Sequence, residues 1–211
     1  MRRLYGCSLA PCPYGKRFGG SALRPTRDEA WELLNEYTTN SSLIKHALAV
    51  EAAMRAYAVK YGEDEQLWAV TGLIHDFDYE QHPTAEEHPL VGATMLQGRG
   101  WPPEVVEAIK GHGTYLNVPR TTMMAKALFA VDELTGLVAA CVLVQPEKNI
   151  ANLKVPSVRK KWKDKAFARG VNRQEIEQAA SELGVDLNEH IAFVIEALKP
   201  VAAELGLAGT W

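Results

Sequence analysis

Four widely spaced residues carry side chains suited to metal chemistry. His46 lies in an apolar helical stretch, His75 and Asp76 close a second apolar run, and Asp132 interrupts the most apolar stretch of the chain. Burying a lone carboxylate costs several kcal/mol, so Asp132 requires a cation or strong hydrogen-bond donors. A divalent metal shared with neutral imidazoles meets that requirement. Imidazole and carboxylate together favour Mn, Fe, Co, Ni or Zn over Mg, which prefers oxygen ligands.

A simpler explanation exists for each residue taken singly. A histidine in an apolar helix is usually a hydrogen-bonded core residue, and a lone aspartate there is often salt-bridged. The joint order argues against this explanation. A histidine, a His-Asp doublet, two further histidines (His88 and His112) and a buried aspartate follow one another along the chain. We therefore interpret the set as metal ligands.

This order resembles the HD-domain superfamily of metal-dependent phosphohydrolases, over roughly residues 41–143. The signature of that superfamily is a histidine, a His-Asp doublet and a later aspartate. Here these positions are His46, His75, Asp76 and Asp132. The resemblance implies that these four residues hold one metal ion.

Some members of the superfamily bind a second metal through two additional histidines. The first usually stands in a His-Pro-x-x-Gly element, which here begins at His88 and ends at Gly92. The second follows an amphipathic helix, which matches His112. The resemblance thus implies one or two metals per chain, with Asp76 bridging them if there are two.

The sequence departs from the cyclic-dinucleotide phosphodiesterase branch of the superfamily. That branch usually begins its second site with a His-His pair and follows it with Gly-Tyr-Pro. Here Gly113 follows His112, and the Gly-Tyr-Pro element does not occur. This branch is therefore not expected.

The resemblance implies hydrolysis of a phosphate ester, such as a nucleotide or another small phosphomonoester or phosphodiester. A divalent cation lowers the pKa of a bound water towards about 7 and neutralises charge on the phosphoryl oxygens. Two alternatives stay open. Some HD-fold proteins with the same six ligand positions are di-iron oxygenases that cleave C–C or C–P bonds. A non-catalytic ligand-binding module is the other alternative, although an intact ligand set argues against it.

Charged residues near the ligands in sequence are candidates for proton transfer and phosphate binding. Asp78 and Glu80, in the loop after the doublet, could relay a proton to the leaving oxygen. Each also fits a solvated loop acid. Four basic residues could contact phosphate oxygens, with Lys110 assigned to catalysis and the others to substrate binding: Lys45, Lys110, Arg120 and Lys126.

A basic segment, residues 159–169, contains six basic residues and one acid. It could bind a polyanionic substrate or fold over the pocket. A solvated helix face explains it equally simply.

These side chains must be positioned by helices, because no segment shows sustained period-two alternation. The fold class is therefore all-α, a compact bundle of the HD-domain type with a C-terminal helical extension. We expect an irregular extension over 1–25, a metal-binding domain over 26–150, and helices of 151–211 packed on that domain. Apolar periodicity and capping residues predict helices over 26–37, 42–61, 64–76, 89–98, 102–111, 122–144, 173–183 and 187–205.

The bulk properties of the 211 residues exclude several classes. The net charge of −3 shows no basic excess, so we expect a small phosphorylated substrate rather than nucleic acid. No apolar run reaches the roughly 18 residues of a membrane span. The three cysteines (Cys7, Cys12 and Cys141) are too few for a disulfide framework and suit a reducing cytoplasm. A homo-oligomer is compatible with the sequence.

Overall fold

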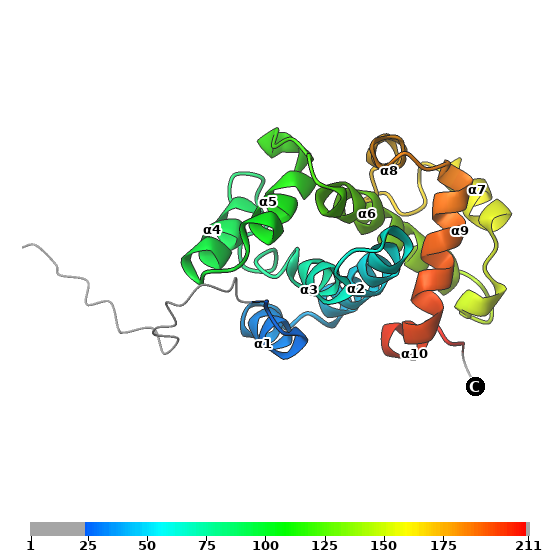
Figure 1. Cartoon of the computed structure of the whole chain (residues 1–211). Helices are drawn as coiled ribbons and strands as arrows, with labels where there is room; N and C mark the ends of the chain where they lie inside the picture. Colours follow the sequence, from blue (N-terminus) through cyan, green and yellow to red (C-terminus); the bar gives the residue numbers. More distant parts are fainter. Residues whose placement is uncertain (1–23, 210–211) are drawn as a thin grey trace, which may run out of the picture.

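The computed structural model describes residues 24–209, and within this range it is all-α with no strand, which confirms the predicted fold class (Figure 1). The proposed extension over 1–25, with Cys7 and Cys12, lies almost entirely outside the described residues. The α-helices are α1 Arg27–Tyr37, α2 Ser41–Tyr61, α3 Glu65–Ile74, α4 Leu90–Gly98, α5 Pro103–His112, α6 Met123–Leu143, α7 Val155–Trp162, α8 Arg173–Leu183, α9 Leu187–Leu198 and α10 Ala202–Leu205.

Short polar side chains set the starts of the helices that carry the site. Asn40 accepts a hydrogen bond from the backbone of Ser42 and so begins α2, one residue before the predicted start. Asp64 caps α3 and Thr122 caps α6 in the same way. Gly62 ends α2 in the left-handed conformation, with a φ of 70°, which leaves only a short turn before α3.

The helices α2, α3 and α6 form the centre of the molecule. The helix α2 packs against both α3 and α6, and α5 packs against α6 (Figure 1). The backbones of α2 and α3 approach closely at Gly72, where a Cβ atom would lie 2.9 Å from the carbonyl oxygen of Val50. This close approach needs glycine, and it holds the end of α3 against α2.

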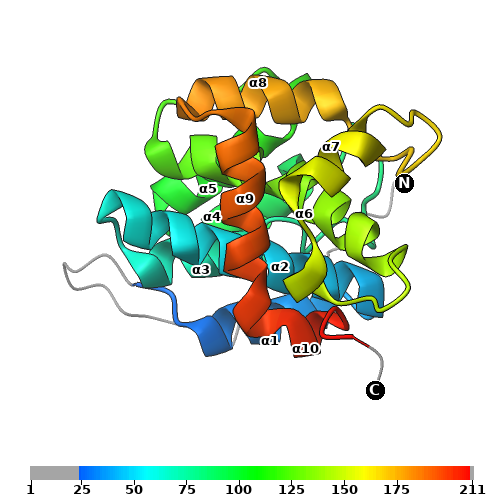
Figure 2. The same cartoon turned by 90° about the vertical axis from the view of Figure 1, so that its right-hand side faces the viewer.

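The C-terminal helices pack on the same core. Figure 2 shows α9 running across the molecule towards α10, and α9 contacts both α2 and α6. The predicted helix over 187–205 is shorter than expected. It ends at Leu198, because Pro200 lacks the backbone donor that a continuing helix requires, and a 3-10 turn leads into α10.

The basic segment is helical only in part. The helix α7 ends at Trp162, so most of residues 163–171 form a loop before α8. A long helix over the whole segment is therefore not formed. No helix among the described residues has both the length and the apolar character needed to cross a membrane.

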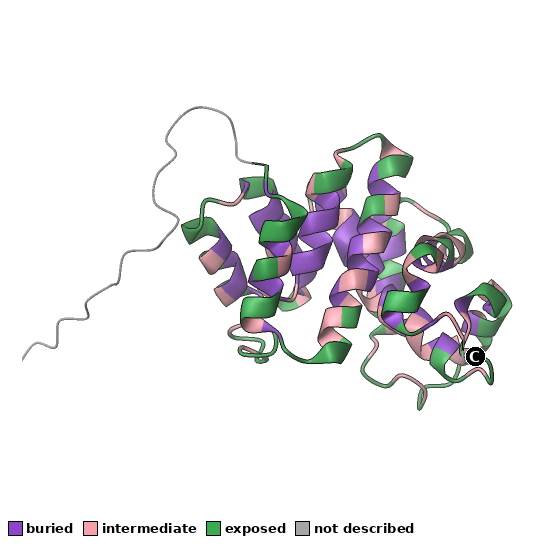
Figure 3. Cartoon of the chain, turned by 90° about the horizontal axis from the view of Figure 1, so that it is seen from below, coloured by how far each residue is buried: buried purple, intermediate pink, exposed green. Residues whose placement is uncertain are grey.

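Buried residues are concentrated on the inward faces of the central helices (Figure 3). One hydrophobic cluster includes side chains from α1 through α10, among them Met54 on α2, Leu128 on α6 and Ile191 on α9. The site residues on α2, α3 and α6 therefore project from helices whose other faces are fixed by packing.

Candidate metal centre

The end of α3 positions the His-Asp doublet. His75 is the C-cap residue and its side chain is fully buried. Its Nδ1–H donates to the carbonyl oxygen of Gly72 at 2.7 Å, since a carbonyl can only accept. The Nε2 lone pair is therefore free to face Asp76 and Asp132, which is the tautomer that a metal requires.

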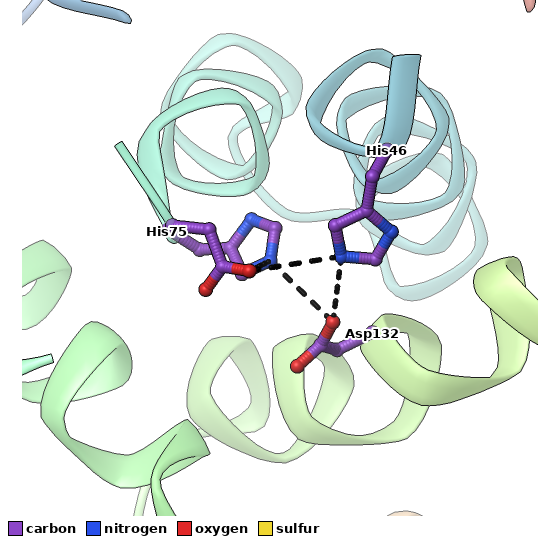
Figure 4. Close-up of side chains that lie close together, drawn as sticks. His46, His75 and Asp132 are labelled. Atoms are coloured by element: carbon purple, nitrogen blue, oxygen red, sulfur yellow. Dashed lines mark hydrogen bonds and ion pairs between the residues drawn. The ribbon is translucent and has the colours of Figure 1, made fainter. Parts of the chain in front are cut away.

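The first group of ligand atoms comes from three helical segments, as Figure 4 shows for His46, His75 and Asp132. The Oδ1 atom of Asp132 lies 2.9 Å from Nε2 of His46 and 3.4 Å from Nε2 of His75. The Oδ2 atom of Asp76 lies 3.4 Å from Nε2 of His75 and 3.9 Å from Nε2 of His46. All four side chains thus present one atom to a common point.

The second group consists of His88, His112 and the same Asp76. The Nδ1–H of His112 donates to the carbonyl oxygen of Ile109 at 2.6 Å, and that of His88 donates to Oδ1 of Asp78 at 2.8 Å. Both Nε2 atoms consequently turn inward, 3.2 Å apart. Oδ1 of Asp76 completes the triangle, at 3.2 Å from His88 and 3.1 Å from His112.

Asp76 joins the two groups, because its Oδ2 faces the first and its Oδ1 faces the second. The His-Asp doublet therefore supplies a ligand atom to each side of the centre. Such a carboxylate can bridge two cations, which is the role that the sequence assigned to it.

The donor set fits divalent transition metals. The Nε2 atom of His75 and the Oδ1 atom of Asp76 are buried without a hydrogen-bond partner. Two ligands about 2.1 Å from one ion lie roughly 3.0–3.4 Å apart, and most separations within each group are of this size. Two facing Nε2 lone pairs at 3.2 Å also need a cation or a proton between them. The residues present can thus hold one or two metal ions.

The electrostatics of the centre favour positive charge. Burial alone would raise the pKa of Asp76, but His75, His112 and His88 outweigh burial and hold that pKa well below its usual range. Burial likewise opposes a charge on His88, yet Asp76 and Asp78 raise its pKa to about 9. A metal ion supplies the same positive charge and releases the protons that otherwise take its place.

The His-Pro-x-x-Gly element is explained by Asp78. Its buried carboxylate accepts hydrogen bonds from Nδ1 of His88 and from the backbone N–H of Gly92, the latter at 2.7 Å. A Cβ atom at position 92 would lie 2.6 Å from the carboxylate carbon of Asp78. Only glycine therefore fits, and Asp78 positions a ligand instead of facing solvent as a free proton relay.

The structure places Glu80 and Lys110 in hydrogen bonds outside the ligand groups. Glu80 accepts from the backbone N–H groups of Thr39 and Asn40, at 2.7 and 2.9 Å, and so supports the start of α2. These bonds lower the pKa of Glu80. Lys110 forms a surface ion pair with Glu107 at 3.0 Å.

Two of the three expected substrate-binding cations, Arg120 and Lys45, point elsewhere. Arg120 donates to both carboxylate oxygens of Glu182 on α8, at 2.7 and 2.9 Å, and to the carbonyl of Gly111. Lys126 forms no ion pair with another described residue, and its charge contributes, after that of Arg120, to the lowered pKa of Glu182. Lys45 is exposed, and its Nζ lies 3.2 Å from the position of a Cβ on Gly206, near the end of α10.

Two tyrosines beside the second group were not anticipated. The ring of Tyr79 meets His88 edge to face, with ring centroids 5.1 Å apart. The hydroxyl of Tyr115 donates to the carbonyl oxygen of His88. Both residues are more than one-third exposed. Tyrosines in loops carry no periodic signal, so the sequence offered no means of finding them.

Glu133 is a further unanticipated acid, next to the ligand Asp132 in the chain. Burial, followed by the charge of the adjacent Asp132, raises the pKa of Glu133 to about 7. Its Oε2 accepts a hydrogen bond from the backbone N–H of Asn172 at 3.2 Å, where α8 begins. In the sequence, only its position directly after Asp132 could have indicated that Glu133 lies near the ligands.

An all-helical fold with a His, His-Asp and Asp set at its centre defines the HD type of metal centre. The model of the HD domain family matches residues 43–137, a range that contains all six ligand positions from His46 to Asp132. This match agrees with the resemblance of the chain to the HD-domain superfamily over these residues. Searches of curated proteins and of solved structures found no match.

Proposed function

We propose that the protein is a metal-dependent hydrolase that cleaves a phosphate ester in a small phosphomonoester or phosphodiester. The observation that carries this proposal is the position of Asp76 between two groups of ligand atoms. His46, His75, Asp76 and Asp132 would hold the first cation, and His88, His112 and Asp76 the second. Bound divalent cations would activate a water and neutralise charge on the phosphoryl oxygens.

The chain itself supplies orientation. The carbonyls of Gly72 and Ile109 and the carboxylate of Asp78 fix three imidazoles with Nε2 directed inward. Preorganised ligands lower the cost of ordering the site when substrate binds. The partly exposed side chains of His46, Asp76 and Asp132 leave the first group accessible from solvent. A phosphate ester could therefore reach it.

A di-iron oxygenase is the second candidate, because four imidazole nitrogens make the ligand set suitable for iron. Such an enzyme would consume oxygen in the presence of substrate. A phosphohydrolase would release phosphate or an alcohol without consuming oxygen.

The test is metal analysis of protein purified without added metal, followed by a panel of phosphomonoesters and phosphodiesters with Mn, Fe, Co, Ni, Zn or Mg. We expect hydrolysis of at least one ester class with a transition metal, and its loss in Asp76→Asn. Glu107→Gln is the control, since that acid forms only a surface ion pair. Oxygen consumption by the iron form without ester hydrolysis would contradict the proposal.

A further inference from the structure

We propose that the cationic loop, residues 163–171 between α7 and α8, binds an anionic group of the substrate other than the phosphate that is hydrolysed. This inference rests on the proposed function. The chain has a net charge of −3, yet six of its 23 basic residues lie within 159–169 beside a single acid. In the cationic loop, Lys163, Lys165 and Arg169 are exposed, and none forms an ion pair with another described residue.

The fold of the cationic loop leaves these cations free. Asp164, its only acid, turns its Oδ1 towards the backbone N–H groups of Ala166 and Phe167, at 3.0 and 3.3 Å. The aspartate thus caps the loop's own turn. Because Asp164 forms no ion pair with Lys163 or Lys165, the positive charges of these lysines can attract an anion.

Arg173 ties the cationic loop to the start of α8. Its guanidinium donates to the carbonyl oxygens of Trp162, Asp164 and Phe167 at 3.0, 3.2 and 2.6 Å. It also approaches the carbonyls of Ala168 and Val171, at 3.4 and 3.3 Å. Because one guanidinium group binds several carbonyl oxygens, it holds the loop backbone in one place.

The start of α8 is in turn tied to the elements that carry metal ligands. The backbone N–H of Asn172 donates to Glu133, the residue after Asp132. Glu175 accepts from the hydroxyl of Thr114 at 3.1 Å, two residues after His112. The helix α8 also packs along α6 (Figure 1). The end of the cationic loop is therefore joined, through Asn172 and Glu133, to the turn of α6 that carries Asp132.

This placement assigns a substrate class. The carboxyl groups of Glu133 and Glu175 lie at the start of α8, next to the end of the loop, and would repel an approaching anion unless neighbouring cations offset them. The exposed cations of the loop would attract and hold a second phosphate or carboxylate while the first phosphate occupies the centre. We infer a small substrate with at least two anionic groups, such as a bisphosphate.

The experiment compares the metal-loaded wild type with the triple variant Lys163→Gln, Lys165→Gln, Arg169→Gln. Fructose 1,6-bisphosphate and fructose 1-phosphate serve as probes, with binding measured by calorimetry and turnover by phosphate release. The control variant is Lys60→Gln, Lys148→Gln, Lys154→Gln, which removes three other exposed charges. Lys60 lies 14 residues along α2 from His46, about 21 Å away.

We expect the loop variant to bind the bisphosphate about tenfold more weakly and the monophosphate less than about twofold more weakly. The control variant should change both by less than about twofold, and added salt should reduce the wild-type preference. The proposal is overturned if wild type shows no preference for the bisphosphate, or if the loop and control variants behave alike. Absence of phosphate release from every ester of the panel contradicts the proposed function instead, and the calorimetric ratio still decides the role of the loop.

Discussion

Three of the four imidazoles at the centre owe their orientation to a second group on the chain. Backbone carbonyls hold His75 and His112, whereas His88 depends on the carboxylate of Asp78. The position of the Asp78 carboxylate depends in turn on its close contact with Gly92. The second group of ligands is therefore sensitive to a residue that never contacts a metal.

This dependence predicts the effect of Gly92→Ala. The added methyl group would displace the Asp78 carboxylate, because it would lie 2.6 Å from its carbon atom. We expect affinity for the second metal to fall about 10–100-fold, with the first metal retained. Metal titration followed by mass spectrometry measures this change.

Gly98→Ala is the matched control, on the same helix α4. A Cβ atom there meets nothing within 4 Å, so the variant should bind metal normally and be unchanged or slightly more stable. Equal metal affinity in the two variants would show that Asp78 does not position His88.

At the scale of elements, the end of α5, which carries His112, is fixed to the end of α8. Arg120 contributes most visibly, since it joins Glu182 on α8 to the carbonyl of Gly111, one residue before His112. Its guanidinium also lies over the ring of Phe129, 3.8 Å from the centroid. Two hydrogen bonds to one carboxylate and stacking on an aromatic ring together require the planar guanidinium of arginine.

A double-mutant cycle tests this link. Arg120→Met and Glu182→Gln should show a coupling free energy of about 1–2 kcal/mol in urea unfolding, because the Arg120 side chain is only 11% exposed. The Lys110–Glu107 pair, with side chains 24% and 58% exposed, should show a coupling near zero. Similar couplings for the two pairs would refute a special role for Arg120.

The ligands could be predicted from sequence because Asp132 and the doublet lie in apolar helical stretches, where ionisable side chains require compensation wherever the helices lie. The roles of the charged residues near the ligands could not be predicted, because proximity in sequence does not fix the direction in which a side chain points. Lys45 precedes His46 by one residue, yet it points towards Gly206, which follows α10. The positioning role of Asp78 depends on contact with Gly92, fourteen residues later, which only the folded chain brings about.

At the scale of the whole molecule, the C-terminal helices close the core that holds the centre. His190 on α9 donates through Nε2 to the carbonyl of Ala130 on α6 and accepts from the hydroxyl of Tyr57 on α2. It thereby links three helices through a neutral ring. Burial lowers the pKa of His190 to about 4.

This lowered pKa predicts a pH dependence of stability. The folded protein resists protonation of His190, whereas the unfolded chain binds that proton with the ordinary histidine pKa of about 6.5. The contribution of neutral His190 to the free energy of unfolding is complete above about pH 6.5 and is lost as the pH falls towards 4. We expect this residue to make the protein about 2 kcal/mol less stable at pH 5 than at pH 7.

Denaturant unfolding at both pH values measures this difference. Glu133, whose pKa is raised to about 7, contributes with the opposite sign in every variant, so the comparison between variants isolates His190. The difference in stability between pH 7 and pH 5 should shift by about 2 kcal/mol in His190→Gln and stay as in wild type in His82→Gln, on a loop. An unchanged pH profile in His190→Gln would contradict the assignment of a neutral ring to that site.

The central claim is that Asp76 lies between two metals, and metal stoichiometry tests it most directly. Metal content is measured by mass spectrometry after transition-metal loading and desalting, in wild type and in His88→Ala with His112→Ala. Circular dichroism verifies that the fold is retained. The account predicts about two metals per chain in wild type and about one in the double variant, with loss of hydrolysis. One metal in wild type, together with full activity in the double variant, would contradict it.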